Sequence, residues 1–203
     1  TVVITDANNC TATELFTVSE PVILAATAVS EDISCFGLSD GSITLTVAGG
    51  TMDYSFAWTN GETTQNITGL AADNYGVTIT DANGCTVDYS YVVIEPTLLE
   101  VTGIATDLGC YGTQTGAIDI TVTGGTQGYT YLWNDNSLDN DRTGLSGGTF
   151  VVVVTDNHGC TASETFIVIE PSLFIASGVA TNVSCFGGND GAIALTVEGG
   201  VPG

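Results

Sequence analysis

The sequence predicts an all-β protein of tandem immunoglobulin-like β-sandwich domains, which we expect to form a stiff rod. Three observations lead to this prediction. The apolar residues are mostly Val, Ile, Leu, Tyr and Phe mixed with many Thr, a composition typical of strands. Cysteine, tryptophan and glycine positions recur at one fixed spacing. Within each period, roughly six or seven short alternating stretches are separated by turns every 8–12 residues or so, as in small sandwiches.

The dominant feature is a gapless repeat of 75 residues. Cys10, Cys85 and Cys160 follow this period. So do four further sets: Cys35, Cys110 and Cys185; Glu20-Pro21, Glu95-Pro96 and Glu170-Pro171; Gly49-Gly50, Gly124-Gly125 and Gly199-Gly200; Trp58 and Trp133. Solenoid repeats usually span about 20–50 residues, whereas this period suits a small independent domain.

The Glu-Pro steps are the expected junctions between repeats, because proline cannot donate a hydrogen bond to a strand ladder. We therefore expect two complete repeats and two partial ones: 1–20, 21–95, 96–170 and 171–203. The first partial segment is the C-terminal part of a preceding repeat, and the last is the N-terminal part of a following one. No Gly/Ser-rich or Pro-rich linker separates the repeats, so the array should be stiff. We expect the chain to be a piece of a longer polypeptide.

The strands of one repeat can be placed from their alternation. In repeat 21–95 we expect strands at 22–33, 42–47, 54–58, 63–70, 75–79 and 86–94. Ile43, Leu45 and Val47 should share one face of their strand. Asn60-Gly61 and the segment 81–84 favour tight turns.

The charge balance excludes several partners. The chain carries 23 acidic residues against one basic residue, Arg142, for a formal net charge of −22. Such a surface is repelled by nucleic acid and by anionic membranes. No apolar run is long enough to insert into a bilayer.

Two cysteines per repeat indicate an oxidising, extracytoplasmic location and disulfides that staple a small core. The favoured pairing is within a repeat, Cys35 to Cys85 and Cys110 to Cys160. It leaves the partners of Cys10 and Cys185 outside the chain. A second pairing crosses each Glu-Pro junction: Cys10 to Cys35, Cys85 to Cys110 and Cys160 to Cys185. A third links neighbouring repeats. Zinc is disfavoured, because no Cys-x-x-Cys motif and no nearby histidine occurs.

Candidate ligand sites are few. Two groups of turn residues could bind calcium, although Asp and Asn also favour turns for conformational reasons: Asp40 with Asp81 and Asn83, and Asp135 with Asp139 and Asp141. The aromatic strands could bind a sugar through Tyr54, Trp58, Tyr131 and Trp133, or could pack into the core. No cofactor is expected apart from this calcium. No enzyme is expected either, because no repeated position places a nucleophile beside a base, and His158 simply occupies a turn.

The string from Cys35 to Val47, followed by Gly49-Gly50 and by 54–58, resembles the SprB repeat. So does the string from Cys185 to Gly191. The middle repeat departs from this pattern, with Tyr111 in place of Phe and Thr115 in place of Asp. The resemblance implies very large cell-surface adhesins of gliding bacteria, exported by the type IX secretion system and carried along the surface as filaments.

The leading functional hypothesis is therefore a structural segment of a secreted, cell-surface adhesin or filament that supports surface adhesion and gliding motility. Its expected partners are extracellular surfaces or polysaccharides, neighbouring repeats of the chain, and other copies in a filament. One alternative is a carbohydrate- or surface-binding module in which each repeat binds ligand. Another is a self-assembling extracellular filament or surface layer.

Overall fold

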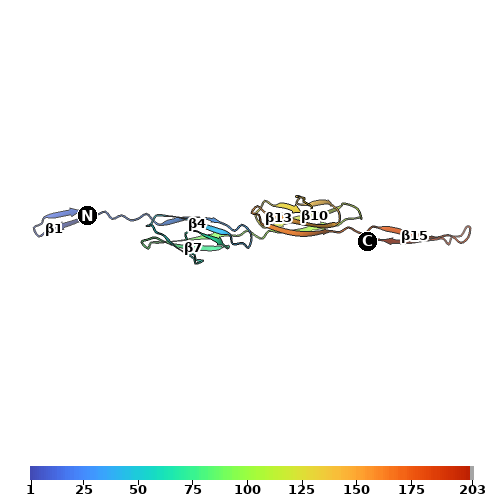
Figure 1. The fold of residues 1–203 in the computed structure, drawn as a ribbon, viewed down its shortest axis with the longest axis horizontal. Helices are drawn as coiled ribbons and strands as arrows, with labels where there is room; N and C mark the ends of the chain where they lie inside the picture. Colours follow the sequence, from blue (N-terminus) through green and yellow to red (C-terminus); the bar gives the residue numbers. More distant parts are fainter. Residues whose placement is uncertain (202–203) are drawn as a thin grey trace. The chain divides into compact units, whose positions relative to one another are not determined.

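The computed structural model describes residues 1–201, in which strands and turns are the only regular structure (Figure 1). The predicted partial repeat 171–203 thus extends two residues beyond the described part. The sixteen strands are β1 (Val2–Thr5), β2 (Thr11–Glu14), β3 (Ala25–Glu31), β4 (Gly41–Ala48), β5 (Ser55–Trp58), β6 (Ile67–Leu70), β7 (Asp73–Thr80), β8 (Thr86–Val93), β9 (Glu100–Thr106), β10 (Gly116–Thr123), β11 (Thr130–Trp133), β12 (Arg142–Leu145), β13 (Gly148–Thr155), β14 (Thr161–Val168), β15 (Ile175–Thr181) and β16 (Ala192–Glu198). Residues 1–201 contain no helix long and apolar enough to span a membrane.

The chain divides into two compact units. Unit 1 comprises Thr1–Ile33 and Ser39–Ile94, and unit 2 comprises Ser34–Leu38 and the chain from Glu95 onward. The boundary between Ile94 and Glu95 falls next to the Glu-Pro step. Unit 2 also contains the turn Ser34–Leu38, although the residues on both sides of this turn belong to unit 1. A division of the chain at the Glu-Pro steps alone would place this turn in unit 1.

Each unit contains one sandwich of two three-stranded antiparallel sheets. In unit 1 the strand orders are β3-β4-β6 and β5-β7-β8, and in unit 2 they are β9-β10-β12 and β11-β13-β14. With the six strands lettered A, B, C, E, F and G in sequence, both units have sheets A-B-E and C-F-G. This is the arrangement of immunoglobulin-like sandwiches, so the predicted fold class is confirmed.

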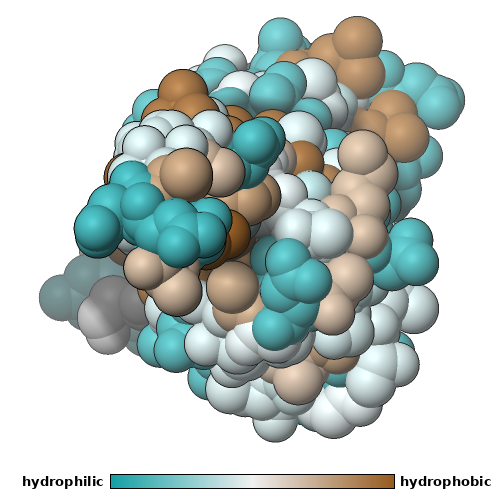
Figure 2. Space-filling view, turned by 90° about the vertical axis from the view of Figure 1, so that its left-hand side faces the viewer, coloured by the Kyte–Doolittle hydropathy of each residue, from teal (hydrophilic) through white to brown (hydrophobic). Residues whose placement is uncertain are grey.

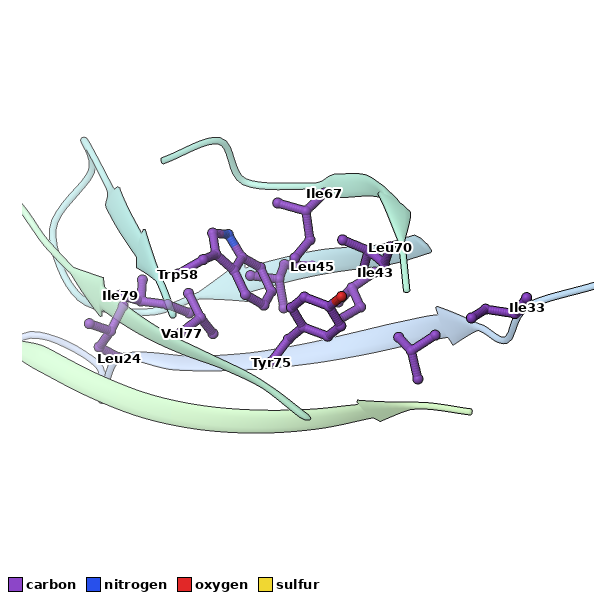
Figure 3. Packing of buried hydrophobic residues seen from close by; sticks show 11 residues of the cluster. Leu24, Ile33, Ile43, Leu45, Trp58, Ile67, Leu70, Tyr75, Val77 and Ile79 are labelled. Atoms are coloured by element: carbon purple, nitrogen blue, oxygen red, sulfur yellow. The ribbon is translucent and has the colours of Figure 1, made fainter. Parts of the chain in front are cut away.

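The core of unit 1 lies between its two sheets, as the alternation predicts. Ile43 and Leu45 of β4 point inward and are buried, while the alternating Thr44 and Thr46 are exposed. They pack with Trp58 of β5 in one cluster (Figure 3). Burying each of these aliphatic side chains stabilises the fold by about 1.5–3 kcal/mol. Unit 2 repeats this core with Ile118 and Trp133.

A tyrosine corner supports this assignment. The hydroxyl of Tyr75, near the start of β7, donates to the Ala71 carbonyl four residues earlier, at 3.0 Å. Immunoglobulin-like sandwiches place such a tyrosine at the same corner. The counterpart in unit 2 is Phe150, which has no hydroxyl to donate.

The first and last strands of each sandwich end at the same pole. The Ile33 amide donates to the Ile94 carbonyl, and the Ile94 amide donates to the carboxylate of Asp32. Since Ile33 follows β3 and Ile94 follows β8, these two strands run in the same direction. The chain therefore enters a sandwich at one pole, the N-terminal pole, and leaves it at the other, the C-terminal pole. The same bonds recur in unit 2 at Leu108 and Ile169.

The flanking segments form hairpins without a facing sheet. In β15–β16, Ile193, Leu195 and Val197 occupy the positions of core residues one or two periods earlier, yet they are 78%, 67% and 49% exposed. The hairpin β1–β2 is exposed along its length as well. Figure 2 shows hydrophobic and hydrophilic residues interspersed on the face in view.

Two predicted strands are shorter than expected. The prediction placed a strand at 63–70, whereas β6 covers Ile67–Leu70. It placed another at 22–33, whereas β3 covers Ala25–Glu31. The preceding residues approach a glycine pair instead of a neighbouring strand: the Gly50 amide donates to the Val22 carbonyl at 2.7 Å. That bond holds residues 22–24 as an irregular segment across the N-terminal pole.

Tyr75→Phe should destabilise unit 1 by about 1 kcal/mol, because it removes one partly buried hydrogen bond and changes nothing else. The measurement is denaturant unfolding followed by the fluorescence of Trp58, in a chain carrying Trp133→Phe so that only unit 1 reports. Phe150→Tyr, read through Trp133 in the reciprocal background, is the matched gain-of-bond variant. An unchanged unfolding midpoint for Tyr75→Phe would contradict the corner.

Candidate functional site

The N-terminal pole of each sandwich is organised by one buried carboxylate. In unit 1 this is Asp81, which follows β7 and is 5% exposed. Its Oδ1 accepts the amides of Asn83 and Cys85, both at 2.9 Å. Its Oδ2 accepts the amide of Thr51, also at 2.9 Å, which ties the Asp81 turn to the loop after β4. The turn therefore presents Cys85 in a fixed position.

Unit 2 has the same arrangement around Asp156. The amides of His158 and Cys160 donate to Oδ1 at 2.9 Å, and the amide of Thr126 donates to Oδ2 at 2.8 Å. Nδ1 of His158 lies 3.2 Å from the Thr126 hydroxyl and 3.3 Å from the Ser34 carbonyl. His158 is thus a turn residue that also contacts the Ser34–Leu38 turn.

These backbone donors shift the titration of both carboxyls. Amide hydrogen bonds, from Thr51 first and then Cys85, hold the pKa of Asp81 below the ordinary value of 3.8. For Asp156 burial acts to raise the pKa, but the bonds from Thr126, Cys160 and His158 outweigh it, and the pKa is again lowered. Both groups are therefore held as carboxylates at neutral pH.

The glycine pair is needed because the pole is crowded. Gly49 has φ of 73°, and a Cβ there would lie 2.0 Å from the carbonyl oxygen of Ile23. A Cβ on Gly50 would lie 2.9 Å from Oδ2 of Asp81. Gly124 and Gly125 repeat both approaches in unit 2. Only glycine lets the irregular segment and the carboxylate approach the same loop.

A disulfide joins Cys35 to Cys160, with the two Cα atoms 5.7 Å apart. Cys160 belongs to the N-terminal pole of unit 2, and Cys35 belongs to the turn Ser34–Leu38 that is part of the same unit. The turn is held in place at a second point, because the Gly37 amide donates to the Glu95 carboxylate at 2.9 Å. Closing a loop over a sequence separation of 125 residues stabilises the fold by about 5 kcal/mol in the chain-entropy model.

The disulfide corrects the favoured pairing. Cys35 to Cys85 and Cys110 to Cys160 are wrong here, because Cys35 and Cys160 are bonded to each other. The reason lies in the strand directions. Cys35 follows β3 at the C-terminal pole of its sandwich, whereas Cys85 follows β7 at the N-terminal pole, so the sandwich holds them apart. The pairing across each Glu-Pro junction is excluded for the same two residues, and the third scheme, linking neighbouring repeats, is the one the structure adopts.

The remaining four cysteines are unpaired and exposed: Cys10, Cys85, Cys110 and Cys185. Cys35 and Cys160, in contrast, are half-buried. Cys85 is the counterpart of Cys160, and Cys110 is the counterpart of Cys35, so the same two local structures occur here without their partners.

The structure does not bring the first group of calcium candidates together. Asp40 precedes the start of β4, whereas Asp81 binds Thr51, beyond the other end of β4. An eight-residue strand spans about 26 Å, so these carboxylates cannot share one ion. Both oxygens of Asp81 are already bound to amides. The amide nitrogen of Asn83 donates to the Thr51 hydroxyl at 2.8 Å.

The second group is arranged around a cation that the chain itself supplies. Arg142 forms a bidentate pair with Asp135, at 3.0 and 2.6 Å, which lowers the pKa of Asp135. The Asp139 carboxylate accepts the Ser137 hydroxyl, and the Asp141 carboxylate accepts the Ile120 amide. Within residues 1–201, no three His, Cys, Asp or Glu side chains are placed to hold a metal. Calcium binding stays a prediction without a preformed site.

The aromatic candidates lie in the core. Trp58 is 4% exposed and Trp133 is 1% exposed, and their indole N–H groups donate to the carbonyls of Thr64 and Asp139. Tyr54 and Tyr131 are half-buried and pack against the same cores. Of the two predicted roles for these aromatic residues, the structure shows packing in the core. A sugar face built on the two tryptophans is excluded by their burial.

The N-terminal pole as a site was missed by sequence reasoning, although its parts recur in the sequence. Asp81, Cys85 and Gly49-Gly50 each follow the 75-residue period, but they come from separate turns. A periodic carboxylate placed four residues before a periodic cysteine was the available signal, because such an aspartate can accept the cysteine amide.

Asp81→Asn should lower the melting temperature of unit 1 by at least about 5 °C, because the amide group turns an N–H donor toward backbone amides that need an acceptor. Trp58 fluorescence in the Trp133→Phe background measures it. Glu62→Gln removes one negative charge from an exposed turn of the same unit and should have little effect.

Acidification should narrow the difference in melting temperature between the wild type and Asp81→Asn. The pKa of Asp81 is lowered in the folded state, so its stabilisation is present above about pH 4 and is lost as the pH falls through the lowered value. Relief of the general negative charge affects both chains alike. The melting temperatures of wild type and Asp81→Asn should therefore converge below pH 4. A constant difference down to pH 2 would contradict the role of the carboxylate.

Non-reducing peptide mapping of the oxidised chain should recover one linked pair, containing Cys35 and Cys160. Cys35→Ser should abolish it and make Cys160 accessible to alkylation, because the thiol then has no partner. Cys110→Ser is the matched control and should leave the pair intact. Recovery of Cys35 linked to Cys85 would overturn the assignment.

Comparison with known proteins follows the same period. The SprB repeat family matches residues 27–63, 102–138 and 177–203, segments whose starts are 75 residues apart. Each begins within the first strand of a repeat and contains the cysteine turn and the glycine pair. No curated protein matches the chain.

Among solved structures, the C-terminal 282-residue fragment of intimin, in complex with the translocated intimin receptor intimin-binding domain, matches with a TM-score of 0.42 and 17% identity over 78% of this chain and 67% of that one. The N-terminal eight immunoglobulin domains of Down syndrome cell adhesion molecule give 0.39 and 11%, over 72% of this chain and 24% of that one. The amphioxus IgVJ-C2 molecule gives 0.31 and 11%, over 74% and 98%. The immunoglobulin-like assignment rests on the strand order of each sandwich, and the chain belongs to the SprB repeat family, whose repeat it carries in three segments.

Proposed function

We propose that this chain is a non-enzymatic, force-transmitting segment of a cell-surface repeat protein of the adhesin type. The observation that carries the proposal is the disulfide between Cys35 and Cys160, which joins successive repeats of the sequence. SprB family membership supports a cell-surface repeat region. A paired cysteine of this kind also requires an oxidising environment, as found outside the cytoplasm.

Three further features support a mechanical role. The Glu-Pro junctions are short, and no flexible linker separates the repeats. Within a sandwich, the chain enters at one pole and leaves at the other, so a pull on the two ends of one sandwich acts along its strands. A force along the strands must break many contacts together and cannot open them one by one. The acidic surface keeps neighbouring copies from associating without specificity.

A binding function for each repeat has less support. The tryptophans that would form an aromatic platform are buried, and the chain offers one basic side chain, Arg142, which is paired with Asp135. Adhesion to polysaccharides or other surfaces is then the task of other parts of the parent protein. The finer role in gliding motility and the type IX route of export remain proposals that follow from family membership.

Pulling the oxidised chain by its two ends tests the proposal. The disulfide excludes 125 residues of sequence separation from the force path, which is about 440 Å of extended chain at 3.5 Å per residue. Cys35→Ser should therefore extend about 440 Å further before the chain is taut, as measured by single-molecule force spectroscopy.

Cys110→Ser provides the control, because it removes a cysteine of the same turn type that has no partner in the chain. Its extension should equal that of the oxidised wild type. Equal extensions for wild type and Cys35→Ser would show that the disulfide carries no load, and the mechanical proposal would fail.

A further inference from the structure

The N-terminal pole of unit 2 is completed by a turn, and that of unit 1 is not. In unit 2, Cys160 is half-buried and bonded to Cys35 of the Ser34–Leu38 turn. In unit 1, the equivalent Cys85 is held by the same carboxylate geometry but is exposed and unpaired. The two poles differ mainly in this turn.

A groove marks the place that the turn would occupy in unit 1. The groove of unit 2, about 310 Å³, is lined first by Leu98, Leu99, Cys160 and Thr161 and second by Phe36 and Leu38 of the turn. The groove of unit 1 is about 530 Å³ and contains the counterparts of the first group. Those counterparts are Ile23, Leu24, Cys85 and Thr86. The larger groove has an apolar wall and a thiol, but no turn.

A turn equivalent to Ser34–Leu38 is preformed later in the chain as well. In the turn Cys110-Tyr111-Gly112, the Gly112 amide donates to the Glu170 carboxylate at 2.7 Å, as Gly37 does to Glu95. Gly112 has φ of 74°, close to the 79° of Gly37. Phe36, which lines the groove of unit 2, is 50% exposed, Tyr111 is 56% exposed, and in the last repeat Phe186 is fully exposed. The turns at Cys110 and Cys185 thus present an unpaired thiol beside an accessible aromatic ring.

We propose that the groove of unit 1 is an acceptor site for the Cys-aromatic-Gly turn of another SprB repeat, which bonds covalently to Cys85. Cys110 and Cys185 are the matching donor cysteines. In a longer array the donor turn comes from the preceding repeat, with the separation of 125 residues seen for Cys35 and Cys160. The proposal holds whatever the array binds.

The bond requires an oxidant. Cys85 and the donor cysteine each lose one proton and one electron, and a disulfide such as oxidised glutathione is reduced to two thiols. The groove provides the selectivity, because the apolar contacts of the aromatic residue stabilise the cross-linked product over the glutathione adduct.

The consequence is a chain of overlapping loops. The separation of the paired cysteines, 125 residues, exceeds the period of 75, so Cys110 lies inside the loop closed by Cys35 and Cys160. If each repeat pairs in this way, the first cysteine of each disulfide loop precedes the last cysteine of the loop before it. A covalent path that crosses the Cys35–Cys160 disulfide then follows only the 25 residues from Cys160 to Cys185 before it reaches the next disulfide. Such an array stays covalently taut even if its sandwiches unfold.

The chain contains its own control for the site. Cys10 has the same turn as Cys85, with its amide donating to Asp6 at 2.8 Å, but its hairpin β1–β2 is not part of a sandwich. A difference between the two cysteines therefore reports the groove and not the turn. The chain Cys110→Ser with Cys185→Ser keeps both acceptors and removes the donors.

The test incubates this variant with a peptide of residues 182–191 in a buffer of oxidised and reduced glutathione, and measures mixed disulfides by mass spectrometry. We expect at least about tenfold more peptide adduct at Cys85 than at Cys10, since about 1.4 kcal/mol of contact energy suffices for that ratio. Phe186→Ala in the peptide should reduce the ratio toward one. Ile23→Ser in the chain should do the same, whereas Val29→Ser, an exposed residue outside the groove, should not.

Equal adduct at Cys10 and Cys85 would overturn the proposal, as would a ratio that survives both Phe186→Ala and Ile23→Ser. A second measurement uses the wild-type chain at high concentration in the same buffer. Its disulfide-linked oligomers should contain Cys85 bonded to Cys110 or Cys185 of a second copy. Oligomers linked mainly through Cys85 to Cys85 would also reject the acceptor site.

Discussion

A buried carboxylate that accepts three backbone amides is the interaction on which the N-terminal pole of each sandwich depends. Asp81 and Asp156 each tie the turn after the fifth strand of their sandwich, β7 or β13, to the loop that follows the glycine pair. The carboxylate is satisfied without a cation, which matters in a chain with one basic residue. The cysteine at the end of the turn inherits its position from this bond, so the disulfide chemistry rests on the carboxylate.

The hydrophobic core and the cysteines occupy different parts of each repeat. The sandwich of each unit has a hydrophobic core of its own, with one tryptophan in each. The cysteines lie at the two poles and contribute nothing to that core. Their bond closes a loop through successive repeats and leaves the inside of each sandwich to hydrophobic packing. The proposed mechanical role fits this division, because a core could unfold while the bond between Cys35 and Cys160 keeps the covalent path short.

The substitutions between repeats show which contacts are interchangeable. The buried Ile67 of unit 1 is replaced by Arg142 in unit 2, which stacks over Trp133 at 5.2 Å and pairs with Asp135. The apolar stem and planar guanidinium of Arg142 cover Trp133, whereas in unit 1 Ile67 packs in one cluster with the equivalent Trp58. Likewise Tyr75 becomes Phe150, which keeps the ring and loses the hydroxyl bond. The packing position is retained in both cases, while the polar contact is specific to one unit.

The sequence by itself determined the period, the all-β class, and the strands of each repeat, because alternation and turn residues act over a few neighbouring positions. Alternation alone placed Ile43 and Leu45 on one face of their strand. Burial was decided by the tertiary structure: Trp58 and Trp133 could have formed a sugar-binding face, yet the packing of the two sheets encloses them. The partner of Cys35 was likewise set by strand direction, since β3 carries it to the pole opposite Cys85. Pairing over 125 residues depends on the turn Ser34–Leu38 being part of unit 2, which local sequence does not encode.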